Sequence, residues 1–156
     1  MTAGVDAAVV RRFGPDLMRR VQARVLDEYL VEQPVGTAFL IDTGDAERPW
    51  VCHAPTMRVP CDISGTDAVY AATWAALLAV YRHNAAARAA ADPAAEIGGV
   101  VFPAMGCGFG GVDPSESARQ MAAACRFYFQ PPHRLDWDAA VERQKAIRYD
   151  EGRRVC

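Results

Sequence analysis

Four glycines within six residues form the part of the sequence whose residue types and spacing best fit a chemical role. They follow an apolar run at 97–103 (IGGVVFP) and precede Asp113 and Pro114, a pair typical of a helix start; they are Gly106, Gly108, Gly110 and Gly111. Glycine allows successive backbone N–H groups to point at one anion, and the N-terminal end of a helix attracts negative charge. An apolar strand, a glycine-rich turn and a capped helix therefore predict a phosphate cradle.

Two common glycine-rich nucleotide motifs do not match this loop. It contains no lysine, which the GxxxxGK[ST] phosphate loop requires, and the dinucleotide fingerprint normally stands near the start of its domain. The remaining alternative is a flexible loop without a function. Because glycine costs backbone entropy, four glycines so close together after a core strand favour a geometric reason.

Strands and helices alternate along the chain, which predicts an α/β domain that positions this loop. Residues 5–29 are expected to be helical with a break near Gly14 and Pro15. The run 97–103 has no polar face and is expected to be a strand buried on both sides. The other expected elements are strands at 37–43 and 50–55, a helix capped by Thr66 or Asp67, a helix capped by Asp113 with Glu116 as capping-box acid, and an amphipathic stretch at 137–147.

The bulk properties restrict the class of protein. The length of 156 residues fits one domain, with 1–130 as its core and 131–156 as a helical tail packed against it. The net charge of −2 gives no overall field to attract nucleic acid or an anionic membrane. Five cysteines without a CxxC pair argue against a disulfide framework and against a four-ligand zinc site. No signal peptide or membrane-spanning run is evident, and a cytoplasmic location is expected.

Several segments carry a resemblance to macrodomains, the ADP-ribose-binding family. Residues 100–111 (VVFPAMGCGFGG) resemble the family's phosphate loop, and 51–57 (VCHAPTM) resemble one of its strands. Residues 1–13 are similar to the family's first loop and first helix. Residues 116–124 (ESARQMAAA) resemble the helix after the phosphate loop in a bacterial and phage-associated subgroup. The segments occur in the family's order and cover most of residues 1–130.

The resemblance implies a three-layer α/β/α domain in which helices flank a mixed sheet and ADP-ribose lies along two loops. For an enzyme of this family it implies hydrolysis of an ADP-ribosyl bond, with Asp6 orienting water and without a metal or a cofactor. Carried over by position, the first loop comprises Ala3, Gly4, Val5 and Asp6, and the second comprises Ala104, Met105, Gly106, Cys107, Gly108, Phe109, Gly110 and Gly111.

The sequence departs from the family pattern at its start. Met1 aligns inside the motif that normally follows two strands, one of which carries an asparagine used in catalysis. Either the start is placed too late, or the domain is a shortened form that exposes a sheet edge and is expected to form a homodimer or to aggregate. The missing asparagine favours binding over hydrolysis. A second hypothesis is a degenerate domain that serves as an interaction or assembly module without ligand turnover.

Three single residues fit both a structural and a functional role. Asp6 is either a water-orienting acid or an acid that stabilises a helix start, and the second is slightly favoured. Cys107 lies close to a helix start, but no histidine is near it in sequence, which favours a small loop filler over a nucleophile. His53 lies in an apolar strand and is expected to be a satisfied core residue.

Overall fold

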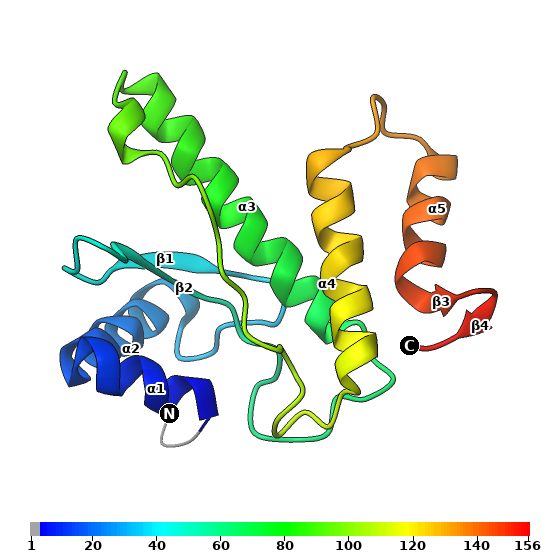
Figure 1. The fold of residues 1–156 in the computed structure, drawn as a ribbon, viewed down its shortest axis with the longest axis horizontal. Helices are drawn as coiled ribbons and strands as arrows, with labels where there is room; N and C mark the ends of the chain where they lie inside the picture. The colour runs from blue at the N-terminus through cyan, green and yellow to red at the C-terminus, as the bar shows by residue number, and fades with distance from the viewer. Residues whose placement is uncertain (1–3) are drawn as a thin grey trace.

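A computed structural model describes residues 4–156 and shows helices and short strands in mixed order (Figure 1). No helix in this range is long and apolar enough to cross a bilayer. The elements are α1 (Gly4–Phe13), α2 (Pro15–Tyr29), β1 (Phe39–Asp42), β2 (Trp50–His53), α3 (Ala68–Ala89), the 3₁₀ turn η1 (Pro93–Ala95), α4 (Pro114–Phe129), α5 (Trp137–Arg148), β3 (Tyr149–Asp150) and β4 (Arg153–Arg154).

The break predicted in the first helical region is confirmed at Gly14. Its φ of 83° lies in the left-handed region, where glycine is favoured, and Pro15 then begins α2. Residues Leu17 and Val21 of α2 are buried against β1, where they share a core cluster with Phe39 and other apolar residues. The pair α1–α2 therefore lies against the ribbon formed by β1 and β2 (Figure 1).

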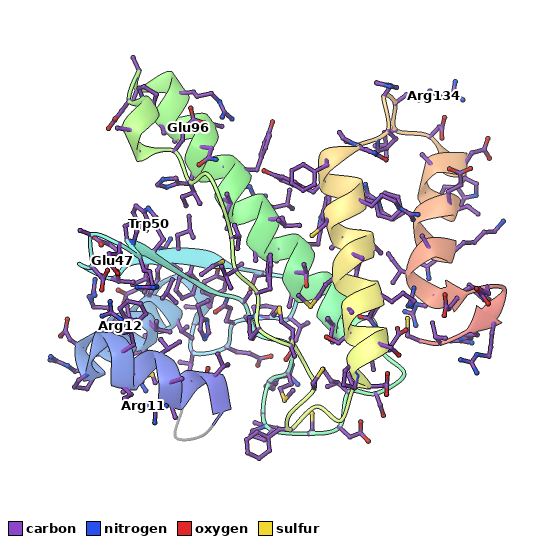
Figure 2. The ribbon with its side chains drawn as sticks, viewed as in Figure 1. Arg11, Arg12, Glu47, Trp50, Glu96 and Arg134 are labelled. Atoms are coloured by element: carbon purple, nitrogen blue, oxygen red, sulfur yellow. The ribbon has the colours of Figure 1, made fainter. Side chains whose placement is uncertain are left out.

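Both strands predicted in the first half of the chain are confirmed, and they pair with each other. β1 and β2 run antiparallel, with Phe39 opposite His53 and Asp42 opposite Trp50. Figure 2 shows Arg12 of α1 below the end of this ribbon, and Arg12 forms an ion pair with Asp45 in the turn between the strands. The ribbon is thereby tied to α1.

The centre of the molecule is the packing of α3 against α4. Asp113 caps α4 as predicted, its carboxylate accepting the N–H of Ser115 at 2.8 Å. Glu116 does not complete a capping box, because its carboxylate binds Arg119 and Gln120 instead. The N-terminus of α4 is therefore capped by Asp113 without the reciprocal Glu116 bond that the sequence predicted.

The last helix, α5, packs on α3 and α4 through cationic side chains. The Arg143 guanidinium lies 4.7 Å from the ring centre of Trp74 and 4.7 Å from that of Phe127. Arg119 donates to the carbonyls of Ala146 at 2.8 Å and Ile147 at 2.7 Å. The segment predicted as an amphipathic stretch is a helix in contact with the core.

The prediction of a buried strand at 97–103 is wrong. The segment is extended but is not paired with a strand, and most of its residues are exposed. The described residues form two separate two-stranded antiparallel sheets, so the single mixed sheet of a three-layer domain is not seen among them. The physical reason is that, among residues 4–156, no strand pairs with 97–103 to accept and donate its backbone hydrogen bonds.

Candidate functional site

One large open groove brings the two predicted loops together. It has a volume of about 1850 Å³ and lies between α1, β2 and the chain from Glu96 to Gly110. Of the predicted binding residues, those that line it are Gly4, Val5, Asp6, Ala104, Met105, Gly106, Gly108, Phe109 and Gly110. Cys107 and Gly111 are not part of its lining, and Ala3 lies outside the described residues.

The glycines of the second loop have different physical reasons to be glycine. A Cβ atom on Gly106 would lie 2.8 Å from the Val69 side chain, and one on Gly110 would lie 2.5 Å from the carbonyl oxygen of Gly106. Gly111 has a φ of 63°, in the left-handed region. Gly108 has open space around its Cα and an ordinary φ. Packing and backbone geometry therefore account for three glycines, and Gly108 is left as part of the open surface.

Several backbone N–H groups of the second loop face no protein acceptor. The N–H of Cys107 bonds to Ala104 at 3.3 Å, and that of Gly111 bonds to Gly108 at 3.2 Å. Among residues 4–156, no acceptor pairs with the N–H groups of Gly108, Phe109 and Gly110. Three successive N–H groups beside an open groove are the donors that a diphosphate requires.

The start of α4 contributes less to an anion site than the sequence indicated. The Asp113 carboxylate already accepts the backbone N–H and the hydroxyl of Ser115, and these bonds hold the Asp113 pKa below its usual value. A negative charge therefore already stands at this helix end. Ser117, one turn further, donates its hydroxyl to the Met105 carbonyl at 2.7 Å and holds the loop on the helix. The donors of the site belong to the loop rather than to the helix.

Asp6 and His53 face the same groove from α1 and β2. Asp6 is an acid in the first turn of α1, consistent with the helix-stabilising role considered above. Burial lowers the pKa of His53, and the negative charge of Asp6 opposes that shift. The two side chains are therefore coupled electrostatically.

The His53 ring is held by Gln33. Nδ1 of His53 lies 2.6 Å from Oε1 of Gln33, a contact that assigns the ring proton to Nδ1 and leaves Nε2 as an acceptor in the neutral ring. The prediction that His53 is satisfied by a partner is confirmed, but its place on the groove was missed. Gln33 lies in the irregular segment after α2, and no sequence pattern connected it to a residue 20 positions later.

The described residues provide no further reactive centre in the second loop. The Cys107 thiol donates to the Met105 carbonyl at 3.8 Å, consistent with a loop filler. Burial raises the pKa of the Cys52 thiol to about 11, so this groove residue stays protonated near neutrality. Across residues 4–156, no three His, Cys, Asp or Glu side chains gather as metal ligands would.

Comparison with known proteins gives one family. The family model of the Macro domain matches residues 1–121. A curated protein of Aeropyrum pernix, described as uncharacterized, is 33% identical over 110 residues, which cover 69% of this chain and 52% of the relative. The chain thus spans about half the length of that relative. No solved structure shows a significant match.

Proposed function

The chain belongs to the macrodomain family, and from this premise we propose that it binds ADP-ribose or an ADP-ribosylated group in the groove. Members of this family generally bind ADP-ribose. The observation that carries the proposal is the set of unpaired N–H groups on Gly108, Phe109 and Gly110, which border the same groove as Gly4 and Val5.

The ligand would use the two loops in different ways. The diphosphate would accept hydrogen bonds from the N–H groups of the second loop, because a loop with three free donors replaces the hydration of a dianion. Phe109 is 68% exposed at the groove and offers a ring face to a ribose or a base. Gly4 and Val5 would cover the ligand from the α1 side.

Hydrolysis of an ADP-ribosyl bond is the reaction proposed for this site, ranked below binding. Asp6 would orient the attacking water, and its carboxylate faces the groove. Turnover of an ADP-ribosylated peptide that Asp6→Ala leaves unchanged would contradict this role. Asp27→Ala, on the exposed face of α2, is the matched control.

Titration calorimetry with ADP-ribose, with AMP as the comparison ligand, tests the binding proposal. Gly108→Glu places a negative charge on the loop without a steric clash, because the space around Gly108 is open. It is expected to abolish binding, while Ala118→Glu on the exposed face of α4 leaves it intact. Equal heats for ADP-ribose and AMP, or binding unaffected by Gly108→Glu, would contradict the proposal.

A second function, assembly without ligand turnover, is favoured by the unpaired extended segment 97–103. A folded protein that gives no heat with ADP-ribose and forms a defined oligomer would support it over ligand binding. Placement in the bacterial and phage-associated subgroup rests on residues 116–124. Five free thiols suit a reducing compartment such as the cytoplasm.

A further inference from the structure

The segment between β2 and α3 runs beside the second loop (Figure 1). Ile63, in this segment, donates its backbone N–H to the Gly110 carbonyl at 2.9 Å. Its side chain fills the inside of the loop: a Cβ atom would lie 2.9 Å from Cγ1 of Ile63 if built on Gly110, and 3.3 Å from Cδ1 if built on Gly106. Ile63 is 7% exposed, so it is a core residue around which the loop is folded.

The loop closes into a ring around this side chain. The N–H of Val112 bonds to the Gly106 carbonyl at 3.1 Å, which joins the two ends of the ring. Val69 and Val112 are the buried residues that share a core cluster with Ile63. Because protein interiors are close-packed, such a cluster favours one shape of the ring over its alternatives.

A buried hydrogen-bond network fixes the position of Ile63. The Ile63 carbonyl accepts the N–H of Thr66 at 3.2 Å and its hydroxyl at 2.7 Å. The Thr66 carbonyl in turn accepts the side-chain N–H of Gln120 at 2.8 Å, and Gln120 lies on α4. Ile63 is therefore held in a fixed position relative to α4.

The start of the loop has its own attachment to α4. The Ser117 hydroxyl donates to the Met105 carbonyl at 2.7 Å, and Ser117 is 1% exposed. Ser117 thus holds the loop at residue 105, as Ile63 holds it at residue 110. The three unpaired N–H groups of residues 108–110 lie between these two carbonyl groups along the chain. Because both attachments bind carbonyl oxygens, they orient the loop backbone without occupying its donors.

Fixed donors favour the binding of an anion. A loop that becomes ordered only on binding loses part of its affinity to the entropy of that ordering, whereas donors that already point at the anion do not. Glycine-rich segments are flexible when nothing holds them. The glycines therefore allow the ring to form, and the residues packed inside and behind it determine how rigid it is.

We propose that Ile63 is a positioning residue for diphosphate recognition, which holds the donors of residues 108–110 in the conformation that binds the ligand. Ser117 has the same role at the other end of the loop. Neither side chain is among the described residues that line the groove, so both act through the loop and not by touching the ligand. The inference rests on the proposed binding of ADP-ribose and adds two residues outside the loop on which its affinity depends.

Ile63→Val tests this role with a small change to the core. It removes the terminal methyl group that lies nearest to Gly106 and keeps the backbone bond to Gly110. Ile147→Val is the matched control, because Ile147 is 6% exposed in the cluster formed by α3, α4 and α5 and loses the same methyl group. Both variants are compared at a temperature at which urea unfolding shows each of them to be fully folded.

NMR relaxation of the ligand-free protein measures the rigidity of the donors. In the wild-type chain, the backbone order parameters of residues 108–110 are expected to be about 0.85, the value of a rigid backbone. Ile63→Val should lower them towards the flexible range below about 0.6, and Ile147→Val should leave them unchanged. A residue that only stabilised the fold would not change this readout.

Titration calorimetry with ADP-ribose measures the consequence for binding. Ile63→Val is expected to raise the Kd roughly 3- to 10-fold, because the loop must then be ordered when the ligand binds. Ser117→Ala removes only the hydroxyl group and is expected to raise the Kd by a similar factor. Ile147→Val should bind with the affinity of the wild-type chain.

The outcomes separate this inference from the proposed function. A folded wild-type chain that gives no heat with ADP-ribose would overturn both. A wild-type chain that binds, with an affinity or loop order parameters that Ile63→Val and Ser117→Ala leave unchanged, would overturn the positioning role alone. An equal loss of affinity in Ile147→Val would also overturn it, because the effect would then be one of general stability.

Discussion

The carbonyl oxygen of Gly106 lies 2.5 Å from the place that a Cβ atom would occupy on Gly110. The Ile63 side chain is 2.9 Å from the same place, and Ile63 donates its backbone N–H to the Gly110 carbonyl at 2.9 Å. The loop can close back on itself over Ile63 because Gly110 has no side chain. These two glycines build the loop, whereas Gly108 forms part of its exposed surface.

The contrast between these glycines gives the first prediction. Gly110→Ala is expected to lower the free energy of unfolding by about 1–3 kcal/mol, the usual cost of overpacking, because the new methyl group meets backbone. Gly108→Ala is expected to change it by less than about 0.5 kcal/mol, as for other open surface positions. Urea unfolding measures both. Equal effects of the two substitutions would contradict the assignment.

Gln120 gives the second prediction. Its side chain is 1% exposed, accepts the Tyr70 N–H at 2.9 Å and donates to the Thr66 carbonyl at 2.8 Å. Gln120→Leu leaves both backbone groups without a partner, at a cost of about 1–3 kcal/mol each. We therefore expect the free energy of unfolding, measured with urea, to fall by about 2–6 kcal/mol. Gln144→Leu, exposed on α5, is the control and is expected to have little effect.

The third prediction concerns pH. Burial lowers the pKa of His53 below its ordinary value of 6.5, so the unfolded chain takes up this proton more readily than the folded chain. The contribution of His53 to stability is therefore present above pH 6.5 and is lost as the pH falls below it. Urea midpoints measured from about pH 7.5 down to about pH 5.5 should decrease, and less steeply in His53→Gln.

Asp6 sets the size of this effect. Its charge raises the His53 pKa against the effect of burial, so Asp6→Asn should lower the His53 pKa further. NMR titration of the imidazole measures the change directly. Asp27→Asn is the control for loss of an acid on a neighbouring helix. An unchanged His53 pKa in Asp6→Asn would show that the two side chains are not coupled.

Arg119 gives the fourth prediction, about the docking of α5. It binds the Glu116 carboxylate and the carbonyls of Ala146 and Ile147. Lysine cannot reach these acceptors together, because it lacks the planar guanidinium fork. Arg119→Lys should lose about 1.5–3 kcal/mol, the value of a hydrogen bond to a charged group. Hydrogen exchange should speed up in 137–148 first, whereas Arg134→Lys, which is exposed, should leave it unchanged.

Local signals predicted the helices and the first two strands well. Two helix starts were predicted from neighbouring residues alone, one from Gly14 with Pro15 and one from Asp113 with Pro114. The structure confirms both. The N-terminus of α3 is a place where local signals were not sufficient. Of the two predicted caps, the Asp67 side chain makes no capping bond, whereas the Thr66 hydroxyl accepts the Ala68 N–H at 3.4 Å. The Tyr70 N–H is satisfied by Gln120, which lies 50 residues later. Such a partner is fixed by the packing of α3 on α4, which no local pattern specifies.

The prediction that the extended segment 97–103 is a buried strand was wrong for a related reason. An apolar run such as 97–103 indicates a strand, but burial depends on neighbours that lie elsewhere in the chain or in another chain. One part of the candidate site could likewise be predicted from local sequence, and another part could not. The glycine loop was visible as a cluster of glycines, whereas the position of His53 beside Asp6 depends on how α1 lies against the ribbon.

The most direct test of the account is an NMR titration of the ¹⁵N-labelled chain with ADP-ribose. If the second loop holds the diphosphate, the amide signals of Gly108, Phe109 and Gly110 should shift most and move downfield as their N–H groups gain charged acceptors. Smaller shifts are expected at Gly4 and Val5, and AMP should cause weaker changes throughout. Saturating ADP-ribose that leaves the three loop amides unmoved, or that shifts signals only outside the groove, would contradict the account.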